Sequence, residues 1–414
     1  MSKNSSNIKI IPDKKFKTAT ICLMLRRELK REEATKNALL ANMLGSGTLN
    51  YPSLYEINKY MEELYGAIFQ SLIVKKGEFQ IIRLYIEFAS IMDNTILEKA
   101  VDFLHEVLFH PLVDNGGFTK DIFENQKNML RDTISERIND KGSYARQKCI
   151  EHMCKDEPFG IYGDGYSEDL DLIDEKMLYE HYQNIVASTQ VEFIASGNID
   201  AAKFTDLVNE KFSRVSGVSI DTTQQPHAKA QKEPTYHEET LKINQSKICM
   251  GLRADCECKG KAFYNFLVFN EVLGGSGNSK LFTNVREKAS LCYEVFSFLF
   301  RAKSILMIQS GVETKNIDIA LEKINEQIQS IKDGDITEDE LYMAKQSLIS
   351  GLSSITDSQG RILDFNYTQY MLGDSDTLQD IIKGIEDVSI ADVVAHANML
   401  YTDTIYILRG ENDE

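Results

Sequence analysis

The spacing of hydrophobic residues along the chain changes between two periods, and each period predicts one kind of secondary structure. Two runs of alternating apolar and polar residues within residues 67–89 flank Gly77 and predict a β-hairpin. Residues 33–48, EATKNALLANMLGSGT, instead place small apolar residues at helical spacing. We therefore expect a closely packed helix there that ends near Gly45 and Gly47.

Two segments of the form S/T-x-x-E predict helix N-termini. Ser53 precedes Glu56 by three residues, and Thr337 precedes Glu340 by three. In such a capping box, each side chain accepts a hydrogen bond from the free backbone N–H of the other residue. Helices are therefore expected to begin directly after Ser53 and Thr337.

A weak internal repeat indicates that the chain has two related halves. Residues 174–200 predict a helix, a short turn and a strand that ends at a glycine, and residues 390–413 predict the same succession. His181 and His396 occupy similar places in the two predicted helices. We expect both histidines to be partly exposed helix positions.

A polar stretch separates the two halves. Residues 215–236 contain proline and almost no large apolar side chains, which is typical of a linker. A strand-like segment at 241–254 follows. We therefore expect an N-terminal domain of residues 1–214 and a C-terminal domain of residues 237–414. Paired strands among long helices predict an α+β fold, in which each domain is a largely antiparallel sheet covered by helices on one face.

Composition and charge narrow the function classes. The net charge of -17, from 63 acidic and 46 basic residues, excludes nucleic acid as a favoured partner. Such a surface would attract a basic peptide or simply maintain solubility. The N-terminal sequence lacks a signal peptide's apolar run, and no stretch of about 18 apolar residues predicts a membrane helix. Together with seven scattered cysteines, this favours a cytoplasmic protein with reduced thiols.

One local cluster contains metal-binding side-chain types. Helical spacing places Cys149 and His152 on one face but turns Cys154 away, and no fourth ligand lies nearby. Cys256 and Cys258 have no second pair at zinc-ribbon spacing, so we interpret them as loop thiols. A metalloenzyme built on the Cys149 cluster is therefore a third hypothesis, which predicts stoichiometric metal in the isolated chain.

The segment NALLANMLGSGT, residues 37–48, resembles the pitrilysin-like family, which includes insulin-degrading enzyme and the mitochondrial processing peptidase. Active members carry H-x-x-E-H there, in which two histidines one helical turn apart bind zinc and the glutamate activates the metal-bound water. The resemblance places the two histidines at Ala38 and Asn42 and the glutamate at Ala41. No ligand pair and no base remain at these positions.

The resemblance also covers the family's third ligand, a glutamate on a later helix. Residues 122–134, IFENQKNMLRDTI, place it at Thr133, or at Asp132 if the register shifts by one. A lone aspartate does not hold catalytic zinc without the histidines. The resemblance continues through residues 154–170 and covers most of the chain. It implies that this chain binds no metal or other cofactor.

In the second half, residues 273–295 resemble the family's C-terminal-domain segment, in which a glycine-rich turn leads into a helix and then a strand. There, an arginine and a tyrosine seven residues apart bind the substrate backbone and stabilise the tetrahedral intermediate. Arg286 and Tyr293 stand at that spacing. A guanidinium and a phenol both offer donors to an oxygen that gains negative charge. Without the resemblance, they would be an exposed helix charge and an ordinary strand residue.

Three glycines in the same turn are candidate peptide contacts. Gly274, Gly275 and Gly277 would let a peptide backbone come close, although glycine turns are common in proteins of every function. A substrate peptide in extended form would pair with a sheet edge. Residues 67–74 are the candidate edge strand, and an inner strand is an equally good interpretation of them.

The resemblance implies a function because some family members work as pairs of one zinc-bearing chain and one chain without zinc. The leading hypothesis is a non-catalytic subunit of a heterodimeric bacterial zinc peptidase, with Arg286 and Tyr293 completing the site of a zinc-bearing homologue. In Gram-positive bacteria, similar two-chain systems are associated with maturation of small peptides and, for close relatives, with elongation factor P modification. The alternative is a peptide-binding or scaffold protein with no part in catalysis.

Overall fold

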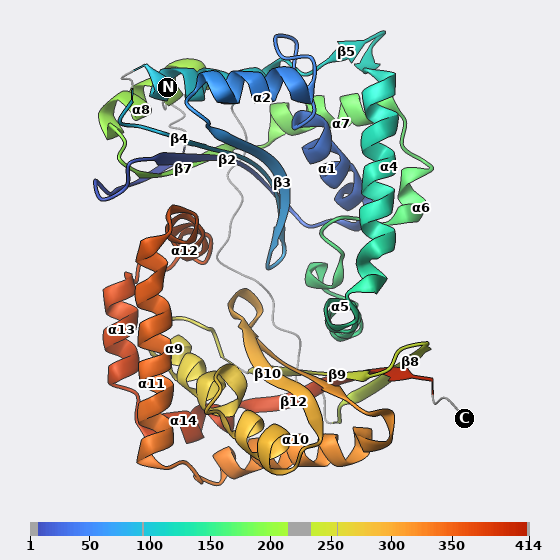
Figure 1. Cartoon of the computed structure of the whole chain (residues 1–414), viewed down its shortest axis with the longest axis vertical. Coiled ribbons are helices and arrows are strands. Elements are labelled where there is room, and N and C mark those ends of the chain that lie inside the picture. Colours follow the sequence, from blue (N-terminus) through green and yellow to red (C-terminus); the bar gives the residue numbers. More distant parts are fainter. Residues whose placement is uncertain (1–6, 93–94, 214–232, 255, 412–414) are drawn as a thin grey trace. The chain divides into compact units, whose positions relative to one another are not determined.

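The computed structural model describes residues 7–92, 95–213, 233–254 and 256–411 (Figure 1). The chain forms two compact units. The first unit consists of Met1–Glu136, Ile161–Asp221 and Ser358–Thr368. The second unit consists of Arg137–Gly160, Thr222–Asp357 and Gln369–Glu414. Residues 137–160 therefore belong to the second unit, although the chain on either side of them belongs to the first. Residues 358–368 belong to the first unit, although the chain on either side of them belongs to the second.

The predicted linker falls largely on residues 214–232, which lie outside the described part of the chain. The described chain resumes at residue 233, and the first strand of the second unit begins at Thr235.

The first unit is built around a five-stranded sheet of order β1-β7-β2-β4-β3. Its strands are β1 (Asn7–Pro12), β2 (Ala19–Glu28), β3 (Ile68–Lys76), β4 (Phe79–Phe88) and β7 (Val191–Gly197), with a small ribbon of β5 (Val113–Asp114) and β6 (Gly117–Phe118). Its helices are α1 (Arg31–Leu44), α2 (Leu54–Glu63), α3 (Ile96–Phe109), α4 (Lys120–Glu136), α6 (Ser167–Leu170), α7 (Glu175–Ser188) and α8 (Ala201–Lys211). Only β1 and β7 pair in parallel, and the other neighbours in this sheet are antiparallel.

Local sequence signals in the first unit are confirmed. β3 and β4 form the expected hairpin, and β3 lies at an edge of the sheet. α1 ends with Gly45 as its C-cap, and β7 ends at Gly197. Ser53 caps α2 by accepting a hydrogen bond from the backbone N–H of Glu56, but the reciprocal bond from Ser53 to the Glu56 side chain is not formed, so only half of the predicted capping box occurs there. Thus the predicted turn, helix end and strand end all occur.

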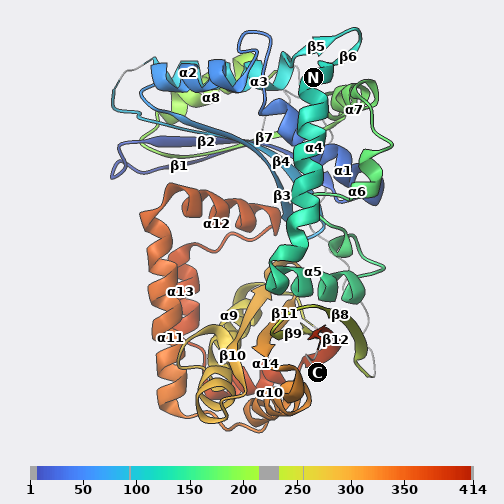
Figure 2. The same cartoon turned by 45° about the vertical axis from the view of Figure 1, so that its right-hand side comes forward.

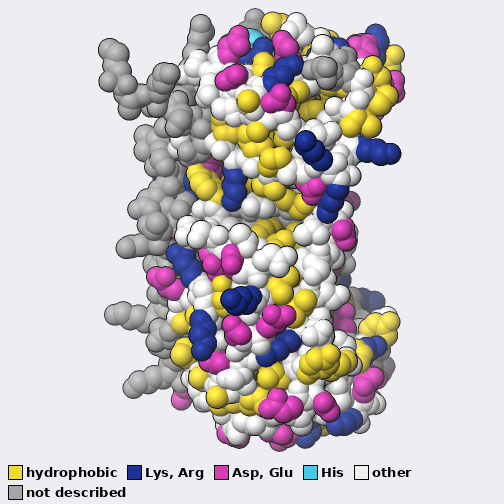
Figure 3. Space-filling model, turned by 90° about the vertical axis from the view of Figure 1, so that its left-hand side faces the viewer, with side chains coloured by type: hydrophobic (Ala, Val, Ile, Leu, Met, Phe, Trp, Pro, Cys, Tyr) yellow, Lys and Arg dark blue, Asp and Glu magenta, His cyan; other side chains and the backbone are white. Residues whose placement is uncertain are grey.

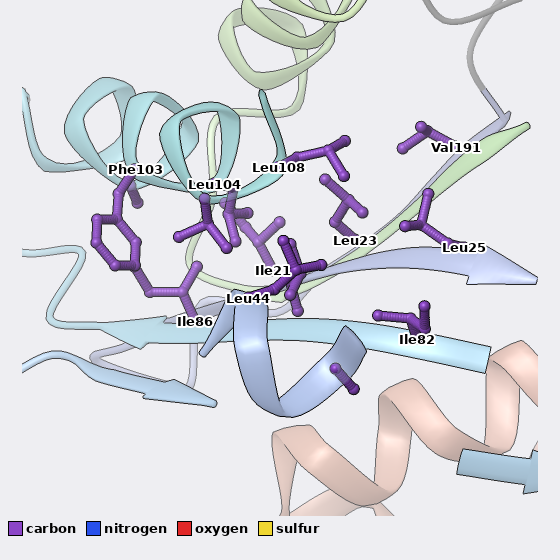
Figure 4. Packing of buried hydrophobic residues seen from close by; sticks show 14 of the residues in the cluster. Ile21, Leu23, Leu25, Leu44, Ile82, Ile86, Phe103, Leu104, Leu108 and Val191 are labelled. Carbon is purple, nitrogen blue, oxygen red and sulfur yellow. The ribbon is translucent and has the colours of Figure 1, made fainter. Parts of the chain in front are cut away.

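One face of the first sheet supports the hydrophobic core of this unit. Alternate residues of β2, including Ile21, Leu23 and Leu25, point to the same side and pack with Leu104 and Leu108 of α3 (Figure 4). All five are at most 1% exposed. Burial of each such side chain stabilises the fold by about 1.5–3 kcal/mol. α3 and α8 cover this face of the sheet (Figure 2).

The second unit repeats the same plan with a sheet of order β10-β11-β9-β12-β8. Its strands are β8 (Thr235–Leu241), β9 (Ser246–Ala254), β10 (Cys292–Phe300), β11 (Ile305–Val312) and β12 (Leu400–Gly410). Its helices are α5 (Lys141–Met153), α9 (Gly260–Asn270), α10 (Ile317–Lys332), α11 (Glu338–Ser353), α13 (Leu378–Glu386) and α14 (Ile390–Ala397). α12 (Gln359–Met371) contributes residues to both units.

Strand by strand, the two sheets have the same topology. β8 pairs with β12 in parallel, as β1 does with β7, and the three remaining neighbours in each sheet are antiparallel. The predicted strand end at Gly410 and the complete capping box of Thr337 and Glu340 are also confirmed. The weak sequence repeat therefore reflects two α+β halves of one design, as predicted.

Each sheet also carries helical cover on its second face, which the sequence did not predict. In the second unit, α5 packs against β9, where Gly251 leaves room for it: a Cβ at Gly251 would lie 2.5 Å from Sδ of Met153. In the first unit, Tyr367 of α12 donates a hydrogen bond of 2.7 Å to Glu192, which pairs with Arg26 at 2.5 Å. Both sheets are thus covered from segments that lie far away in the sequence.

A buried ion network fixes the segment after α5 to the second sheet. Arg253, which is 3% exposed, contacts Glu157 at 2.6 Å and Asp403 at 3.1 Å, and Lys303 contacts Glu157 at 2.7 Å. Removing one member of such a network leaves a buried charge without its partner, which costs about 3–5 kcal/mol. The network explains how a segment from the first half of the sequence stays in the second unit.

Charged side chains of both signs are mixed on one face of the molecule. On the face drawn in Figure 3, acidic and basic side chains are interspersed, with hydrophobic side chains between them. Among the described residues, no helix combines the length and the apolar character that crossing a membrane requires.

Candidate functional site

The positions that correspond to the family's zinc motif lie on α1 and are closed. Ala38 is 1% exposed and Ala41 0%, and both belong to the core of the first unit. Asn42 is half-buried. The hydroxyl of Ser71 on β3 donates a hydrogen bond of 2.6 Å to the carbonyl oxygen of Ala41. The end of α1 is therefore held against the edge strand by a neutral contact, and two of the three positions face packed side chains.

The candidate third ligand position lies on α4, which runs beside α1 (Figure 1). Thr133 and Asp132 are both exposed, and the Thr133 hydroxyl donates to the Met129 carbonyl at 2.9 Å within its own helix. Within the described ranges, no group of three or more histidine, cysteine, aspartate or glutamate side chains could hold a metal ion. Alanine has no donor atom, so the residues at the motif do not fit a catalytic zinc ion.

A polar network lies on the same helix, one residue before the motif. Asn37 is 1% exposed; its amide nitrogen donates to Gln80 at 2.7 Å, and its amide oxygen is 2.7 Å from Nε2 of His181. Burial lowers the pKa of His181 to about 4, so the imidazole is neutral at pH 7. His181 is half-buried, which matches the expected partly exposed position. Its role here is to satisfy the amide of Asn37.

The other predicted histidine differs. His396 is 2% exposed and packs against the ring of Phe266, with centroids 4.5 Å apart, so the expectation of a partly exposed position is wrong for it. Burial lowers its pKa to about 4. The aromatic residues that enclose it come from α9, far away in the sequence, and the local helix pattern carried no sign of them.

The segment that bears Arg286 has an uncommon backbone. α9 continues into a π-helix at Glu271–Gly275, and a second π-helix spans Leu281–Lys288. Such wide turns are rare and are frequent at functional sites. The second π-helix carries Arg286, whose guanidinium carbon lies 4.6 Å from the ring centre of Phe282. Within the described part of the chain, its guanidinium has no hydrogen bond or ion pair, so its donors are free.

Tyr293 lies at the start of the edge strand β10. The pairing of β10 with β11 shifts between Cys292 and Glu294, so Tyr293 is the additional residue of a β-bulge. Its side chain is 73% exposed. Bulges at sheet edges change the direction in which a side chain points and are common beside active sites. Arg286 also lowers the pKa of Cys292 by its charge, although burial raises that pKa overall. Arg286 therefore lies near the residue that precedes Tyr293.

The three candidate glycines occupy different surroundings. Gly274 is buried, and a Cβ there would lie 2.6 Å from Oγ of Ser297 on β10, so close packing alone requires a glycine. Gly275 and Gly277 are exposed, and a Cβ at Gly277 would meet nothing within 4 Å. Of the three, Gly277 has the most open surroundings for a passing peptide backbone.

The cysteines are mostly enclosed by hydrophobic neighbours. Cys149 is 0% exposed and faces the carbonyl oxygen of Cys249 at 3.6 Å, and Cys154 is 1% exposed. Burial raises the pKa of both thiols. His152 instead stacks on His237, with ring centroids 3.8 Å apart. The Cys149 cluster is therefore packed into the contact between α5 and the second sheet.

Of the two loop cysteines, Cys258 is 6% exposed, and burial raises its pKa to about 12. Cys256 is half-buried.

Comparison with known proteins places this arrangement in a family. Residues 173–348 match the family model described as "Peptidase M16 inactive domain". A Bacillus subtilis protein named "Probable inactive metalloprotease YmfF" is 29% identical over 97% of this chain and 95% of its own length. The chain is thus similar to the peptidase M16, or pitrilysin-like, family, by the family model over residues 173–348 and by the relative over nearly its whole length. Ala38 and Ala41 at the zinc-motif positions offer no zinc ligand, and the Bacillus subtilis relative is itself named a probable inactive metalloprotease.

Other similar proteins extend the comparison. "Uncharacterized zinc protease YmxG" of Bacillus subtilis is 24% identical over 76% of this chain and 75% of its own length. A crystal structure of a conserved protein from Enterococcus faecalis superposes with a TM-score of 0.91 at 26% identity, covering 100% of this chain and 99% of the other. A peptidase M16 inactive domain from Pseudomonas fluorescens has a TM-score of 0.81 at 17% identity, over 100% and 98%. The pitrilysin-like fold expected from the sequence is thus confirmed.

Proposed function

We propose that this M16 protein is the non-catalytic subunit of a heterodimeric zinc peptidase. In this proposal, Arg286 and Tyr293 bind the peptide and stabilise the tetrahedral intermediate in the active site of a zinc-bearing homologue. The observation that carries the proposal is a contrast: the motif positions of α1 are closed by alanines, whereas Arg286 and Tyr293 keep free donors.

The surroundings of the two side chains support a role toward a ligand. A guanidinium that has no internal partner among the described residues still has five N–H donors to offer. A phenol that is 73% exposed on a bulge gains little from burial, so packing does not explain why tyrosine is there. Oriented donors of this kind contribute about 2.7–4 kcal/mol each where negative charge develops on an oxygen.

The edge strand β3 supports binding of an extended peptide. Its outer side has no neighbouring strand among the described residues, and Ile68 and Leu72 are 53% and 38% exposed. A strand edge offers backbone hydrogen bonds, while exposed apolar side chains at alternate positions select residues of the peptide. Gly277 is a further candidate contact.

The relatives support a two-chain arrangement. Bacillus subtilis has both a relative named as inactive and a relative named as a zinc protease. A cytoplasmic location, peptide maturation as the process and a zinc-bearing partner all belong to this proposal. The competing function is a scaffold that binds the partner or the peptide without a catalytic contribution.

The test is reconstitution with the zinc-bearing homologue from the same organism. Cleavage of a peptide library is measured with the homologue alone, with this chain, and with the double variant Arg286→Ala and Tyr293→Phe. We expect cleavage to require this chain and the double variant to lower kcat/KM by about 100-fold or more. Lys288→Ala and Tyr236→Phe form the matched control, because both side chains are exposed in the same unit.

Binding between the chains, measured by analytical ultracentrifugation, separates the two functions. If the double variant binds the homologue as the unmodified chain does but fails to restore cleavage, the shared site is supported. Full cleavage with the double variant would contradict it and favour the scaffold.

A further inference from the structure

A cavity of about 430 Å³ lies in the second unit, where the N-terminus of α5 meets the sheet. It is lined by Asn139, Asp140, Lys141, Gly142, Ser143, Arg146, Lys247, Glu294 and Gln309. These residues come from the start of α5 and from three neighbouring strands, β9, β10 and β11. No local sequence motif contains them, so sequence reasoning did not find this cavity.

The lining of the cavity includes the buried residue Gln309, whose amide has an unused donor. Gln309 is 4% exposed, and its amide oxygen accepts a hydrogen bond of 3.3 Å from Arg146. In the described chain, its amide nitrogen, Nε2, has no hydrogen-bond partner. A Cβ at Gly142 would lie 2.6 Å from this nitrogen. The donor is therefore next to another cavity residue, and because this nitrogen is not among the buried unpaired atoms, it is open to the cavity and available to a ligand or to water.

Arg146 is held beside this amide. Its second terminal nitrogen donates to Oγ of Ser143 at 2.7 Å, and its guanidinium carbon lies 5.6 Å from the ring centre of Phe298. The N-terminus of α5, a helix of 13 residues, adds the positive end of the helix dipole. Asp140 already caps this helix end by accepting a hydrogen bond of 3.1 Å from the backbone N–H of Ser143. The side-chain amide and the guanidinium are therefore the donors that line the cavity.

The charges around the cavity favour a ligand with a single negative charge. Three cations line it, namely Lys141, Arg146 and Lys247, against the two carboxyl groups of Asp140 and Glu294. Lys247 contacts Glu294 at 2.7 Å. The local balance is one positive charge on a chain with a net charge of -17. A doubly charged phosphate would exceed this balance, whereas a single carboxylate matches it and suits the planar donors of an arginine.

We propose that this cavity binds the C-terminal carboxylate of an extended peptide. The inference rests on the proposed function in one respect, namely that the ligand is a peptide. Glu294 belongs both to the cavity and to β10, whose outer edge has no neighbour among the described residues. A peptide added along β10 as a further strand would bring one end near the cavity. A volume of about 430 Å³ is at the lower end for ligand sites and suits the end of a chain.

The experiment compares two small probes by saturation-transfer difference NMR, which detects millimolar binding. The probes are N-acetyl-trialanine with a free carboxylate and the same peptide as a carboxamide. We expect the carboxylate to bind the full chain about tenfold more tightly than the amide, because it accepts charge-assisted hydrogen bonds. Arg146→Met and, separately, Lys247→Met are expected to remove this preference.

The control is Arg131→Met on α4, which changes the net charge equally and removes an exposed contact with Asp171. It is expected to keep the preference. Circular dichroism establishes that each variant is folded, and Lys247→Met carries the test if Arg146→Met is not. Equal binding of the two probes, no binding of either, or a preserved preference in the folded cavity variants would overturn the proposal. Reconstituted cleavage depends on Arg286 and Tyr293 instead, so the two proposals fail separately.

Discussion

The two units share one strand order but differ in the side chains at the C-terminal ends of two corresponding helices, α1 in the first unit and α9 in the second. In the first unit, Ser71 on β3 donates to the carbonyl oxygen of Ala41 at 2.6 Å; in the second, Ser297 on β10 donates to the carbonyl oxygen of Asn270 at 3.3 Å. Both serines lie on the edge strand of their sheet, and each of these edge strands pairs in antiparallel with the strand that follows it in the sequence. The two contacts pair Ala41 with Asn270.

A second contact gives the same correspondence. His181 on α7 bonds to Asn37 on α1, and His396 on α14 packs against Phe266 on α9. Asn37 and Phe266 each precede by four residues the carbonyl group that accepts the serine hydrogen bond. Two independent contacts therefore agree on one alignment of the helices.

The alignment pairs Asn42, at the end of the degenerate zinc motif, with Glu271 in the second unit. Asn42 is neutral and half-buried, whereas Glu271 is 7% exposed and accepts a hydrogen bond of 2.6 Å from Ser347. The end of α1 thus carries buried alanines, whereas the corresponding end of α9 carries a buried carboxyl group. The difference shows that the same helix and strand positions can be occupied by apolar contacts in one unit and by a buried carboxyl in the other.

Restoring an acid to the first unit is the strongest way to break this comparison. Ala41→Glu introduces a long, charged side chain at a position that is 0% exposed, beside packed core residues. Overpacking and a buried charge without a partner together should lower the free energy of unfolding by about 4–8 kcal/mol. Urea unfolding followed by circular dichroism measures this. Asn42→His, at the half-buried position, serves as the control, with an expected loss of about 1 kcal/mol or less.

The expected loss assumes that α1 cannot open to solvent at this point. An Ala41→Glu chain as stable as the Asn42→His chain would mean that the motif positions are accessible, and the contrast with the second unit would be lost.

The two histidines sharpen the comparison through pH. Burial lowers the pKa of His396 to about 4 from a usual value of 6.5. Below pH 6.5 the unfolded chain takes up a proton that the folded chain refuses, so stability falls by about 3 kcal/mol as the pH drops to 4. His396→Phe should remove this part of the decline in urea unfolding between pH 7 and 4.5. His181→Gln should remove a similar part, because burial lowers the pKa of His181 to about 4 as well.

An unchanged slope of stability against pH in His396→Phe would count against this assignment. It would mean that the second unit accommodates the imidazolium despite the aromatic rings around it.

The smallest expected effect concerns Glu271. Burial raises its pKa, although the Ser347 hydroxyl opposes the shift. The folded chain therefore holds this proton more tightly than the unfolded chain, and the stabilisation is lost as the pH rises from about 4.5 through the raised pKa. Glu271→Gln should remove that loss and gain up to about 1 kcal/mol at pH 7, with no gain at pH 4.

Differential scanning calorimetry at both pH values measures this difference. Glu62→Gln on the exposed face of α2 is the control and should leave the melting temperature unchanged. A lower melting temperature of Glu271→Gln at pH 7 would show that the ionised carboxylate has a favourable partner.

Much of each half could be predicted because its signals are local. The hairpin around Gly77, the end of α1 at Gly45 and the strand ends at Gly197 and Gly410 each depend on a few neighbouring residues. The exchange of α5 and α12 between the units could not, because helical periodicity shows that a face is apolar but not which sheet it covers.

The candidate site divides in the same way. Arg286 and Tyr293 were found because a family resemblance places them seven residues apart, and the structure adds the π-helix and the bulge. The cavity around Gln309 and the ion network of Arg253 join segments more than 90 residues apart in the sequence. Side chains of this kind look like ordinary surface residues until the fold brings them together.

The assignment of residues 358–368 to the first unit has a consequence for synthesis of the protein. The ribosome completes β1 to α8 long before it makes Tyr367. While most of the second half is translated, the ion pair of Glu192 and Arg26 therefore lacks the hydrogen bond from the Tyr367 hydroxyl. Long-range contacts of this kind slow folding and prolong the exposure of incomplete surfaces. The nascent first half is thus the stage at which the chain is most open to aggregation and to chaperones.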